Sequence, residues 1–306
     1  MLPFRLVYDD RYNLDLGDHV FPAHKYGMIR DRLLADGVAS PEDFEPPAPA
    51  QDDDLALVHD TGWIKRLKTG TLSIPELLRL EMPYSRRIAE VFRLAAGGTI
   101  LAARLALRDG LGFHVGGGFH HAFHDHGEGF CAINDVAVAI RRLLRDGHIE
   151  RAMVVDCDVH HGNGTAALFT GDSRVLTLSI HQFNNYPAEK PPSTIDINLP
   201  DQAGDEEYLE QLRHHYVPAL GAHRPHLIVY LAGADPYYQD QLGGLALTMA
   251  GLRQRDQLVI GTALRSGVPV AVTLAGGYAF QVEDTVTIHV NSVKAAVEAM
   301  AGEQWA

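Results

Sequence analysis

Residues 152–164 read AMVVDCDVHHGNG, an apolar run followed at once by acids, histidines and glycines. An apolar run without alternation is typical of a parallel strand that is covered on both faces. We expect further strands near 4–8, 112–115, 175–180, 227–231 and 268–273. Helical spacing fills most of the intervals, most clearly over 89–107 and 245–265. The sequence therefore predicts an α/β fold with a parallel sheet, in a single domain over 1–306.

Two segments interrupt this pattern. Residues 42–54, EDFEPPAPAQDDD, combine prolines with acids, and residues 187–194, PAEKPPST, form a second irregular stretch. We interpret the first as an exposed connection rather than a linker between two domains, because too little chain precedes it for a parallel-sheet domain.

The composition restricts the function. The chain has 306 residues, of which 46% are hydrophobic and 21% are charged, which is enough apolar material for a core. Its 26 Lys and Arg against 39 Asp and Glu give a net charge of −13, which repels phosphate backbones and anionic membrane surfaces. With 2 cysteines, no signal-like start and no long apolar run, the sequence predicts a cytoplasmic protein that has neither nucleic acid nor membrane as a partner.

Chemically active side chains follow five of the predicted strands. Ligands of parallel sheets bind outside the carboxyl ends of the strands, where loops from several strands converge. His, Asp and Tyr are the residue types that bind metals and transfer protons. In chain order these residues are His120 and His121, then Asp156, Asp158, His160 and His161, then His181, Asp235 and Tyr278. The sequence therefore predicts one site at this edge of the sheet.

The segment DCDVH indicates a metal site. In an extended chain, residues two apart point the same way, so Asp156, Asp158 and His160 share a face and His161 points elsewhere. Two carboxylates on one face need a cation nearby. Ligation by Asp158, His160 and Asp235 would leave one position open for water, which is typical of a catalytic metal. Zinc suits these ligands, and Fe(II), Co(II) and Mn(II) are alternatives.

Simpler interpretations apply to other residues. Taken alone, Asp-x-His after a strand is more often a helix cap than a ligand pair. We interpret Cys131 and Cys157 as small buried side chains. Six further histidines are expected in surface loops or on solvated faces: His124, His126, His214, His215, His223 and His226.

Six motifs, in their order and spacing, resemble those of the zinc-dependent histone deacetylase family, most closely its class IV branch. They are GGGFHHA, GEGFCAIND, VVDCDVHHGNG, LSIHQF, AGADPYYQDQLGGL and LAGGYAF. The resemblance extends from about Leu6 to Lys294. It implies an arginase-like fold, which is a three-layer αβα domain with an eight-stranded parallel sheet. It also implies hydrolysis of acetyl or longer acyl groups from lysine side chains in proteins or peptides.

The resemblance implies two ion sites. Asp158, His160 and Asp235 match the zinc ligands of the family. A structural potassium ion is implied close to them, held by Asp156, Asp158, His160, Ser179 and Ile180.

Catalytic roles are implied in the same way. His120 and His121 match the tandem catalytic histidines, with His121 as general base and then acid, and Asp156 matches the carboxylate that orients His120. Asn163 stands where the class I branch has an aspartate beside the second histidine. Tyr278 matches the tyrosine that polarises the substrate carbonyl and donates to the oxyanion.

A narrow tunnel for acyl-lysine is also implied. Gly129 and Phe130 match one wall, and Tyr186 matches the other. Leu242 stands where acetylpolyamine deacetylases have a glutamate gate, so acyl-lysine is preferred over acetylpolyamine. An acetylpolyamine or other small-molecule amidohydrolase, and a pseudoenzyme that only binds metal, are the alternatives. No residue matches the family's rim aspartate, and the sequence predicts no particular oligomeric state.

Overall fold

The protein forms one sheet of eight parallel strands. The computed structural model describes residues 1–302, so residues 303–306 of the predicted domain lie outside the described residues. The strand order is β2-β1-β3-β8-β7-β4-β5-β6, and every neighbouring pair is parallel, as predicted. The strands are β1 (Arg5–Val7), β2 (Phe44–Glu45), β3 (Leu111–His114), β4 (Ala152–Asp156), β5 (Val175–Gln182), β6 (Ile195–Leu199), β7 (Leu227–Leu231) and β8 (Val270–Thr273).

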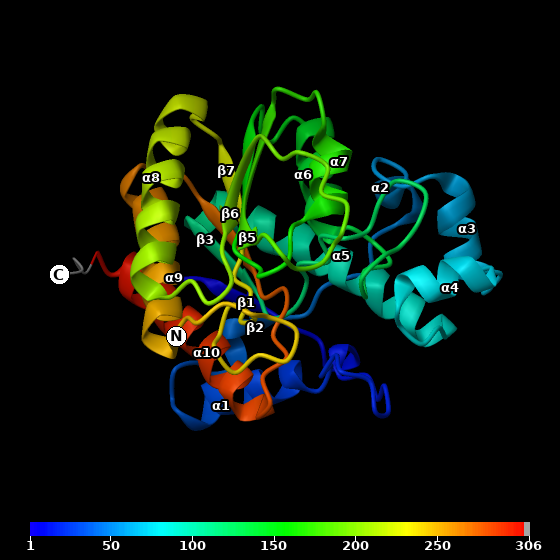
Figure 1. Ribbon diagram of the computed structural model, residues 1–306, viewed down its shortest axis with the longest axis horizontal. Helices are drawn as coiled ribbons and strands as arrows, with labels where there is room; N and C mark the ends of the chain where they lie inside the picture. The colour runs from blue at the N-terminus through cyan, green and yellow to red at the C-terminus, as the bar shows by residue number, and fades with distance from the viewer. Residues whose placement is uncertain (303–306) are drawn as a thin grey trace.

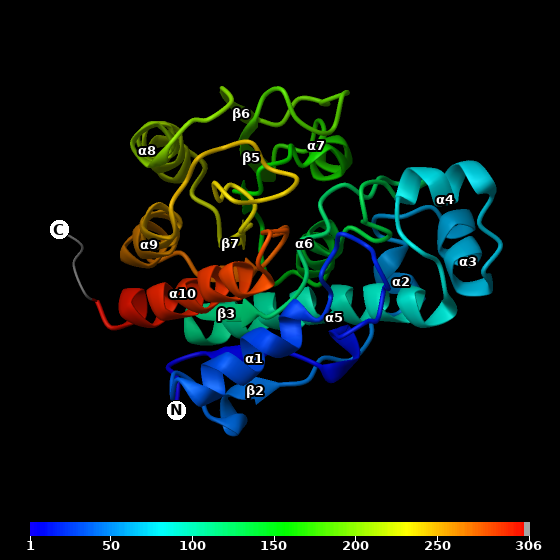
Figure 2. The same cartoon turned by 60° about the horizontal axis from the view of Figure 1, so that its bottom comes forward.

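Helices cover both faces of this sheet. Helix α5 packs against β1, β3, β7 and β8, with α6 beside it (Figure 2) and α7 beside α6. On the other face α8 packs against α9, α9 against α10 and α10 against α1. Figure 1 shows α8 on one side of the strands and α6 and α7 on the other, which confirms the predicted three layers. The helices are α1 (Lys25–Ala35), α2 (Asp52–Leu55), α3 (Thr61–Thr69), α4 (Ile74–Leu80), α5 (Arg86–Asp109), α6 (Asp135–Arg145), α7 (Asn163–Phe169), α8 (Asp205–His223), α9 (Met249–Arg265) and α10 (Val282–Met300).

Helix α5 shows how local sequence sets the limits of an element. The Ser85 side chain caps the first turn by accepting a hydrogen bond from the Ile88 N–H. Gly110 ends the helix with a left-handed φ of 90°. These caps extend the helix slightly beyond the predicted range of 89–107. Within residues 1–302, no helix is both long and apolar enough to cross a membrane.

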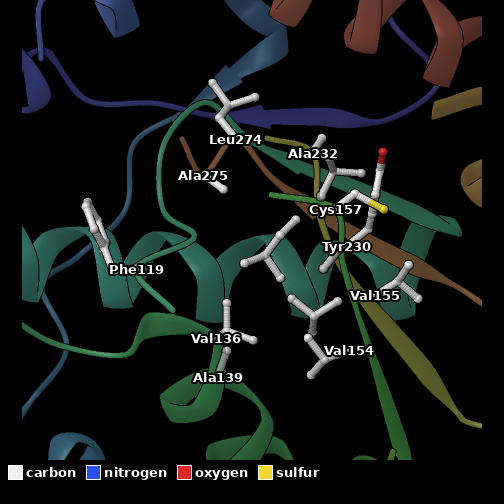
Figure 3. Close-up of a cluster of buried hydrophobic side chains, with 14 of the residues drawn as sticks. Phe119, Val136, Ala139, Val154, Val155, Cys157, Tyr230, Ala232, Leu274 and Ala275 are labelled. Carbon is white, nitrogen blue, oxygen red and sulfur yellow. The ribbon is translucent and has the colours of Figure 1, made fainter. Parts of the chain in front are cut away.

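The core lies between the layers, where the central strands β4 and β7 are buried along their whole length. Figure 3 shows Val136 and Ala139 of α6 in one cluster with Val154 and Val155 of β4 and with Leu274, which follows β8. None of these five side chains is more than 1% exposed. Since each large apolar side chain contributes about 1.5–3 kcal/mol when buried, this core fixes the strands and hence the loops that follow them.

The stretch 42–54 is more ordered than the predicted exposed connection. It contains β2, which adds to the sheet edge beside β1, and helix α2. Asp43 is buried, and hydrogen bonds from the N–H groups of Leu2 and Ser40 to its carboxylate compensate for the lost water. The acids therefore form caps here, while 187–194 is irregular as predicted. The sequence also does not predict β6, whose side chains IDINL alternate in polarity at the opposite edge.

Candidate active site

Four neighbouring strands bring the predicted site residues together. Strands β3, β8, β7 and β4 lie side by side and are parallel, so their carboxyl ends meet at one edge. His120 and His121 follow β3, the DCDVH segment leaves β4, Asp235 follows β7 and Tyr278 follows β8. All of these side chains are buried.

Asp158, His160 and Asp235 form a compact group of metal-ligating side chains. One donor atom of each lies within 4.8 Å of the others. His160 Nδ1 is 2.9 Å from Asp158 Oδ1 and 3.4 Å from Asp235 Oδ2. The Gly276 N–H donates to Asp158 Oδ2, and the Val159 N–H donates to Asp235 Oδ1. Backbone groups therefore hold both carboxylates in place.

This group fits a divalent cation. Within residues 1–302, the buried Asp235 Oδ2 has no hydrogen-bond partner, which is costly for a carboxylate unless a ligand binds it. Burial and the neighbouring Asp158 raise the pKa of Asp235, and a cation between the two carboxylates would remove their repulsion. A Cβ on Gly276 would lie 1.8 Å from Asp235 Oδ2, so only glycine permits this approach. Two carboxylates and one imidazole are a donor set that suits zinc and related ions.

His120 is the charged member of the histidine pair. Its Nδ1–H donates to Asp156 Oδ2 at 2.7 Å, and its Nε2 lies 3.1 Å from His121 Nε2. Burial opposes the charged form, but the carboxylates of Asp156 and Asp158 outweigh it and raise the pKa of His120 to about 9. These carboxylates therefore favour the protonated form of His120.

His121 is the neutral member. Its Nδ1–H donates to Asn163 Oδ1 at 2.7 Å, because an amide oxygen only accepts. Burial, together with the charges of His120 and His160, holds the pKa of His121 well below its usual value. Its Nε2 consequently keeps a lone pair, which is what a general base requires.

Tyr278 keeps its hydroxyl proton. Burial and the carboxylates of Asp158 and Asp235 raise its pKa well above the usual value. The ring centroids of Tyr278 and His160 are 6.4 Å apart. The Tyr278 N–H donates to Asp240 Oδ2 at 2.6 Å, which helps to hold the loop between β8 and α10 in place. A protonated hydroxyl in this position is suited to donate to an oxyanion.

A narrow cavity of about 150 Å³ reaches these groups. Gly129 has a φ of 51°, and a Cβ there would lie 2.8 Å from both His121 Cδ2 and Tyr186 Cε1. Only glycine therefore leaves this passage open. An adjoining space of about 20 Å³ shares several of its walls. The four predicted tunnel residues all line the larger cavity, whose lining is Glu81, His121, Gly129, Phe130, His160, Asn185, Tyr186, Leu242 and Tyr278.

The DCDVH segment reaches the site by a route that differs from the prediction. Strand β4 ends at Asp156, and the chain bends over 157–160 rather than staying extended. The bend, not strand alternation, brings Asp158 and His160 together. The His160 N–H donates to Asp158 Oδ1 at 2.9 Å and so stabilises the bend.

Two histidines near this segment stay outside the site. His161 points away, as predicted, and its Nε2 lies 3.1 Å from Asp196 Oδ1. His181 remains within β5, where its ring centroid lies 4.7 Å from that of His161 and its Nδ1 is 3.0 Å from Ser179 Oγ. The histidines predicted at the surface are exposed or half-buried, and both cysteines are buried and free.

Four residues at or near the site escape sequence reasoning: Lys25, Glu81, Glu128 and Asp240. The fully buried Lys25 donates from Nζ to the Ala275 carbonyl at 3.1 Å, and burial lowers its pKa to about 8. Glu81 lines the cavity. Glu128 and Asp240 lie within two of the six motifs, and this position is the one sequence feature that points to them. No local sequence pattern marks Lys25 or Glu81.

A buried Asp–His–Asp group beside paired histidines, at one edge of a parallel sheet, has the groups that a metal-dependent hydrolase needs. The histone deacetylase domain matches residues 19–293. The chain therefore belongs to the histone deacetylase family, whose members are hydrolases that generally use a divalent metal ion.

Individual relatives agree with this family. An uncharacterized protein of Picosynechococcus sp. is 40% identical over 287 residues, which cover 94% of this chain and 96% of the relative. Histone deacetylase 2 of Arabidopsis thaliana is 30% identical over 286 residues, covering 89% of this chain and 74% of the relative. The crystal structure of the HDA15 HD domain matches with a TM-score of 0.80 at 25% identity, covering 98% of this chain and 88% of that one. The predicted family and fold are thus confirmed.

Proposed function

We propose that the protein is a metal-dependent lysine deacetylase, which hydrolyses the amide bond of acetylated lysine in proteins or peptides. The observation that carries this proposal is the buried Asp158–His160–Asp235 group, whose His160 lines the cavity together with His121 and Tyr278. Membership of a deacetylase family supports the reaction class.

Asp158, His160 and Asp235 would hold the metal, with zinc as the proposed ion and Fe(II), Co(II) or Mn(II) as alternatives. When bound, such an ion lowers the pKa of water and polarises a carbonyl group. We propose the predicted potassium site as well, since Asp156 and Ser179 are register partners on β4 and β5. Its proposed ligands are Asp156, Asp158, His160, Ser179 and Ile180.

The side chains of the protein supply the proton transfers. Neutral His121 takes a proton from the attacking water at Nε2 and later returns it to the departing lysine amine. His120, held by Asp156, stays protonated and stabilises the negative charge that develops beside it. The Tyr278 hydroxyl donates to the oxyanion, a contribution of about 10²- to 10³-fold in rate.

The dimensions of the cavity favour an acetyl group. Phe130 and Tyr186 line the larger cavity and would flank the apolar stem of the lysine. The adjoining space of about 20 Å³ holds on the order of one water molecule, which is too little for a long acyl chain. Glu81 would accept a hydrogen bond from the backbone of the substrate at the mouth of the cavity.

An acetylpolyamine is the second candidate substrate, and Glu81 is the observation that favours it. A carboxylate in the cavity lining attracts a second ammonium group as well as a backbone N–H. Leu242, in the same lining, offers no charge to such a group. We therefore rank acetyl-lysine first.

We propose a cytoplasmic location, with neither nucleic acid nor membrane as a partner. The net charge of −13 supports the absence of polyanionic partners. Both cysteines are free and buried, which agrees with a reducing compartment.

A side-by-side assay tests the proposal. One metal-analysed sample is offered an acetyl-lysine peptide, the same peptide with a longer acyl chain, and acetylspermidine. We expect one divalent ion per chain and a kcat/KM for the acetyl-lysine peptide at least about tenfold above the others. A fully metallated sample that is inert toward the acetyl-lysine peptide contradicts the proposal.

A further inference from the structure

We propose that Glu128 is a positioning residue: it holds the Asn163 amide in the one orientation that keeps His121 in the tautomer of a general base. The inference rests on the proposed function, because that function assigns the base to His121. Glu128 directly precedes Gly129 of the cavity wall, and none of the roles described above uses it.

Asn163 lies between the two side chains and contacts both. Its Oδ1 accepts from His121 Nδ1–H at 2.7 Å, and its Nδ2 donates to Glu128 Oε1 at 2.7 Å. The Gly164 N–H also donates to Oδ1, at 2.9 Å. An amide has one accepting end and one donating end, so the contacts with Glu128 and Gly164 agree on the same orientation.

This orientation decides which nitrogen of His121 carries the proton. With Oδ1 facing Nδ1, the ring proton stays on Nδ1 and Nε2 keeps its lone pair toward His120. If the amide turned over, an Asn163 N–H would face Nδ1, and the ring proton would move to Nε2. His121 could then no longer accept a proton at the atom that faces the site.

A carboxylate is the side chain suited to this task, since it only accepts hydrogen bonds and so binds only the NH₂ end of Asn163. Burial opposes ionisation of Glu128, but its contact with His126, the hydrogen bond from Asn163 and the nearby Tyr186 hydroxyl outweigh it and lower its pKa. His126 Nε2 lies 3.7 Å from Glu128 Oε2, and the other acid that faces Glu128 is Glu81. Glu128 is therefore ionised at neutral pH.

The contact between Glu128 and Asn163 also bears on the departure from the class I pattern, in which an aspartate stands at the position of Asn163. An aspartate at position 163 would present accepting oxygens in either orientation, so it would need no partner to fix it. An asparagine needs one. Glu128 should consequently support the base only while residue 163 is an amide, because it would repel an aspartate at this 2.7 Å contact.

Four variants test this dependence: Glu128→Ala, Glu128→Gln, Asn163→Asp, and Glu128→Ala combined with Asn163→Asp. We expect Glu128→Ala to lower kcat on the acetyl-lysine peptide about tenfold and to leave KM within about threefold. Glu128→Gln should stay within about threefold of the wild type, because its Oε1 still accepts from Asn163. In the Asn163→Asp background, Glu128→Ala should cost less than about twofold. Glu189→Ala, at an exposed glutamate of a nearby loop, is the matched control.

Nitrogen-15 NMR of the histidine side chains reads the tautomer without turnover, with His121→Gln used to assign the signal. The wild type and Glu128→Gln should show a proton on Nδ1 of His121, and Glu128→Ala should show a mixture of tautomers. An unchanged tautomer in Glu128→Ala, or an equal loss of kcat in both backgrounds at position 163, overturns the inference. The wild type could also be inert on acyl-lysine while Glu128→Ala still changes the tautomer of His121. That result supports the positioning by Glu128 and contradicts only the proposed function.

Discussion

Two buried clusters of charged side chains are built on opposite principles. In the first, Asp256 accepts hydrogen bonds from Arg255 Nη2 at 2.8 Å and from the hydroxyl groups of Tyr230 and Ser292 at 2.5 Å. Arg255 also donates from Nη1 to the Gly233 carbonyl at 2.6 Å. Both charges are compensated within the protein, and Arg255 ties the cluster to the loop that precedes Asp235.

In the second cluster, Asp158 and Asp235 share one imidazole, that of His160. Within residues 1–302, Asp235 Oδ2 has no hydrogen-bond partner at all. Buried polar groups are normally paired, and a cation bound between the two carboxylates would compensate this unpaired oxygen. The comparison separates a cluster whose charges are paired within the protein from one that has room for a cation, and we propose that the second one serves the reaction.

The largest effect that this comparison predicts is at Asp235. Asp235→Ala should abolish metal binding and turnover together, because it removes one of the three proposed metal ligands, whose Oδ2 has no hydrogen-bond partner within residues 1–302. Metal analysis and the acetyl-lysine peptide assay on the same sample measure both. Asp18→Ala, at an exposed acid, is the control. Full metal content in Asp235→Ala would show that the ligand assignment is wrong.

Tyr278→Phe should come next. The variant keeps all three metal ligands and loses only the hydroxyl donor, so metal content should stay at the wild-type value while kcat falls about 10²- to 10³-fold. Steady-state kinetics with metal analysis separate the two quantities. A loss of metal in this variant would place Tyr278 in the ligand group instead.

The paired cluster should respond in stability rather than in chemistry. Arg255→Met leaves the buried Asp256 without its cation and should lower the free energy of unfolding by about 3 kcal/mol. The metal content of the folded protein should be unchanged. Denaturant unfolding measures the loss, with the exposed Arg265→Met as control. Unaltered stability would remove the distinction between the two clusters.

Glu81→Gln should have the smallest effect. A neutral acceptor replaces a charged one at the cavity, so KM for the acetyl-lysine peptide should rise about threefold while kcat is retained. Kinetics on the peptide and on acetylspermidine, with Glu189→Gln as control, measure this. A much larger loss on acetylspermidine than on the peptide would favour the polyamine substrate.

The sequence predicts the parts of the site that depend on strand ends. Asp156, Asp158 and Asp235 follow apolar runs, and parallel strands bring such ends to one edge whatever their distance along the chain. The strand ends also supply Tyr278, and the motif resemblance adds its role and the cavity walls. The predicted extended conformation of the DCDVH segment is wrong, because a bend brings Asp158 to His160.

Residues whose roles depend on distant packing cannot be predicted in this way. Lys25 contacts the carbonyl of Ala275, which is 250 positions away, and no local pattern marks either residue. Asp43 lies in an acidic, proline-rich stretch that is predicted to be exposed, yet it is buried and its carboxylate accepts hydrogen bonds from two backbone N–H groups. Hydrogen bonds formed only in the folded state decide these cases.

We propose that one divalent ion, bound by Asp158, His160 and Asp235, enables the hydrolysis of acetyl-lysine. The most direct test removes metal with a chelator, returns zinc in steps, and measures turnover of the acetyl-lysine peptide against bound metal. We expect no turnover without metal, and a turnover rate that rises linearly with bound zinc until it saturates at one ion per chain. Full turnover by the metal-free protein, or none at one ion per chain, would contradict it.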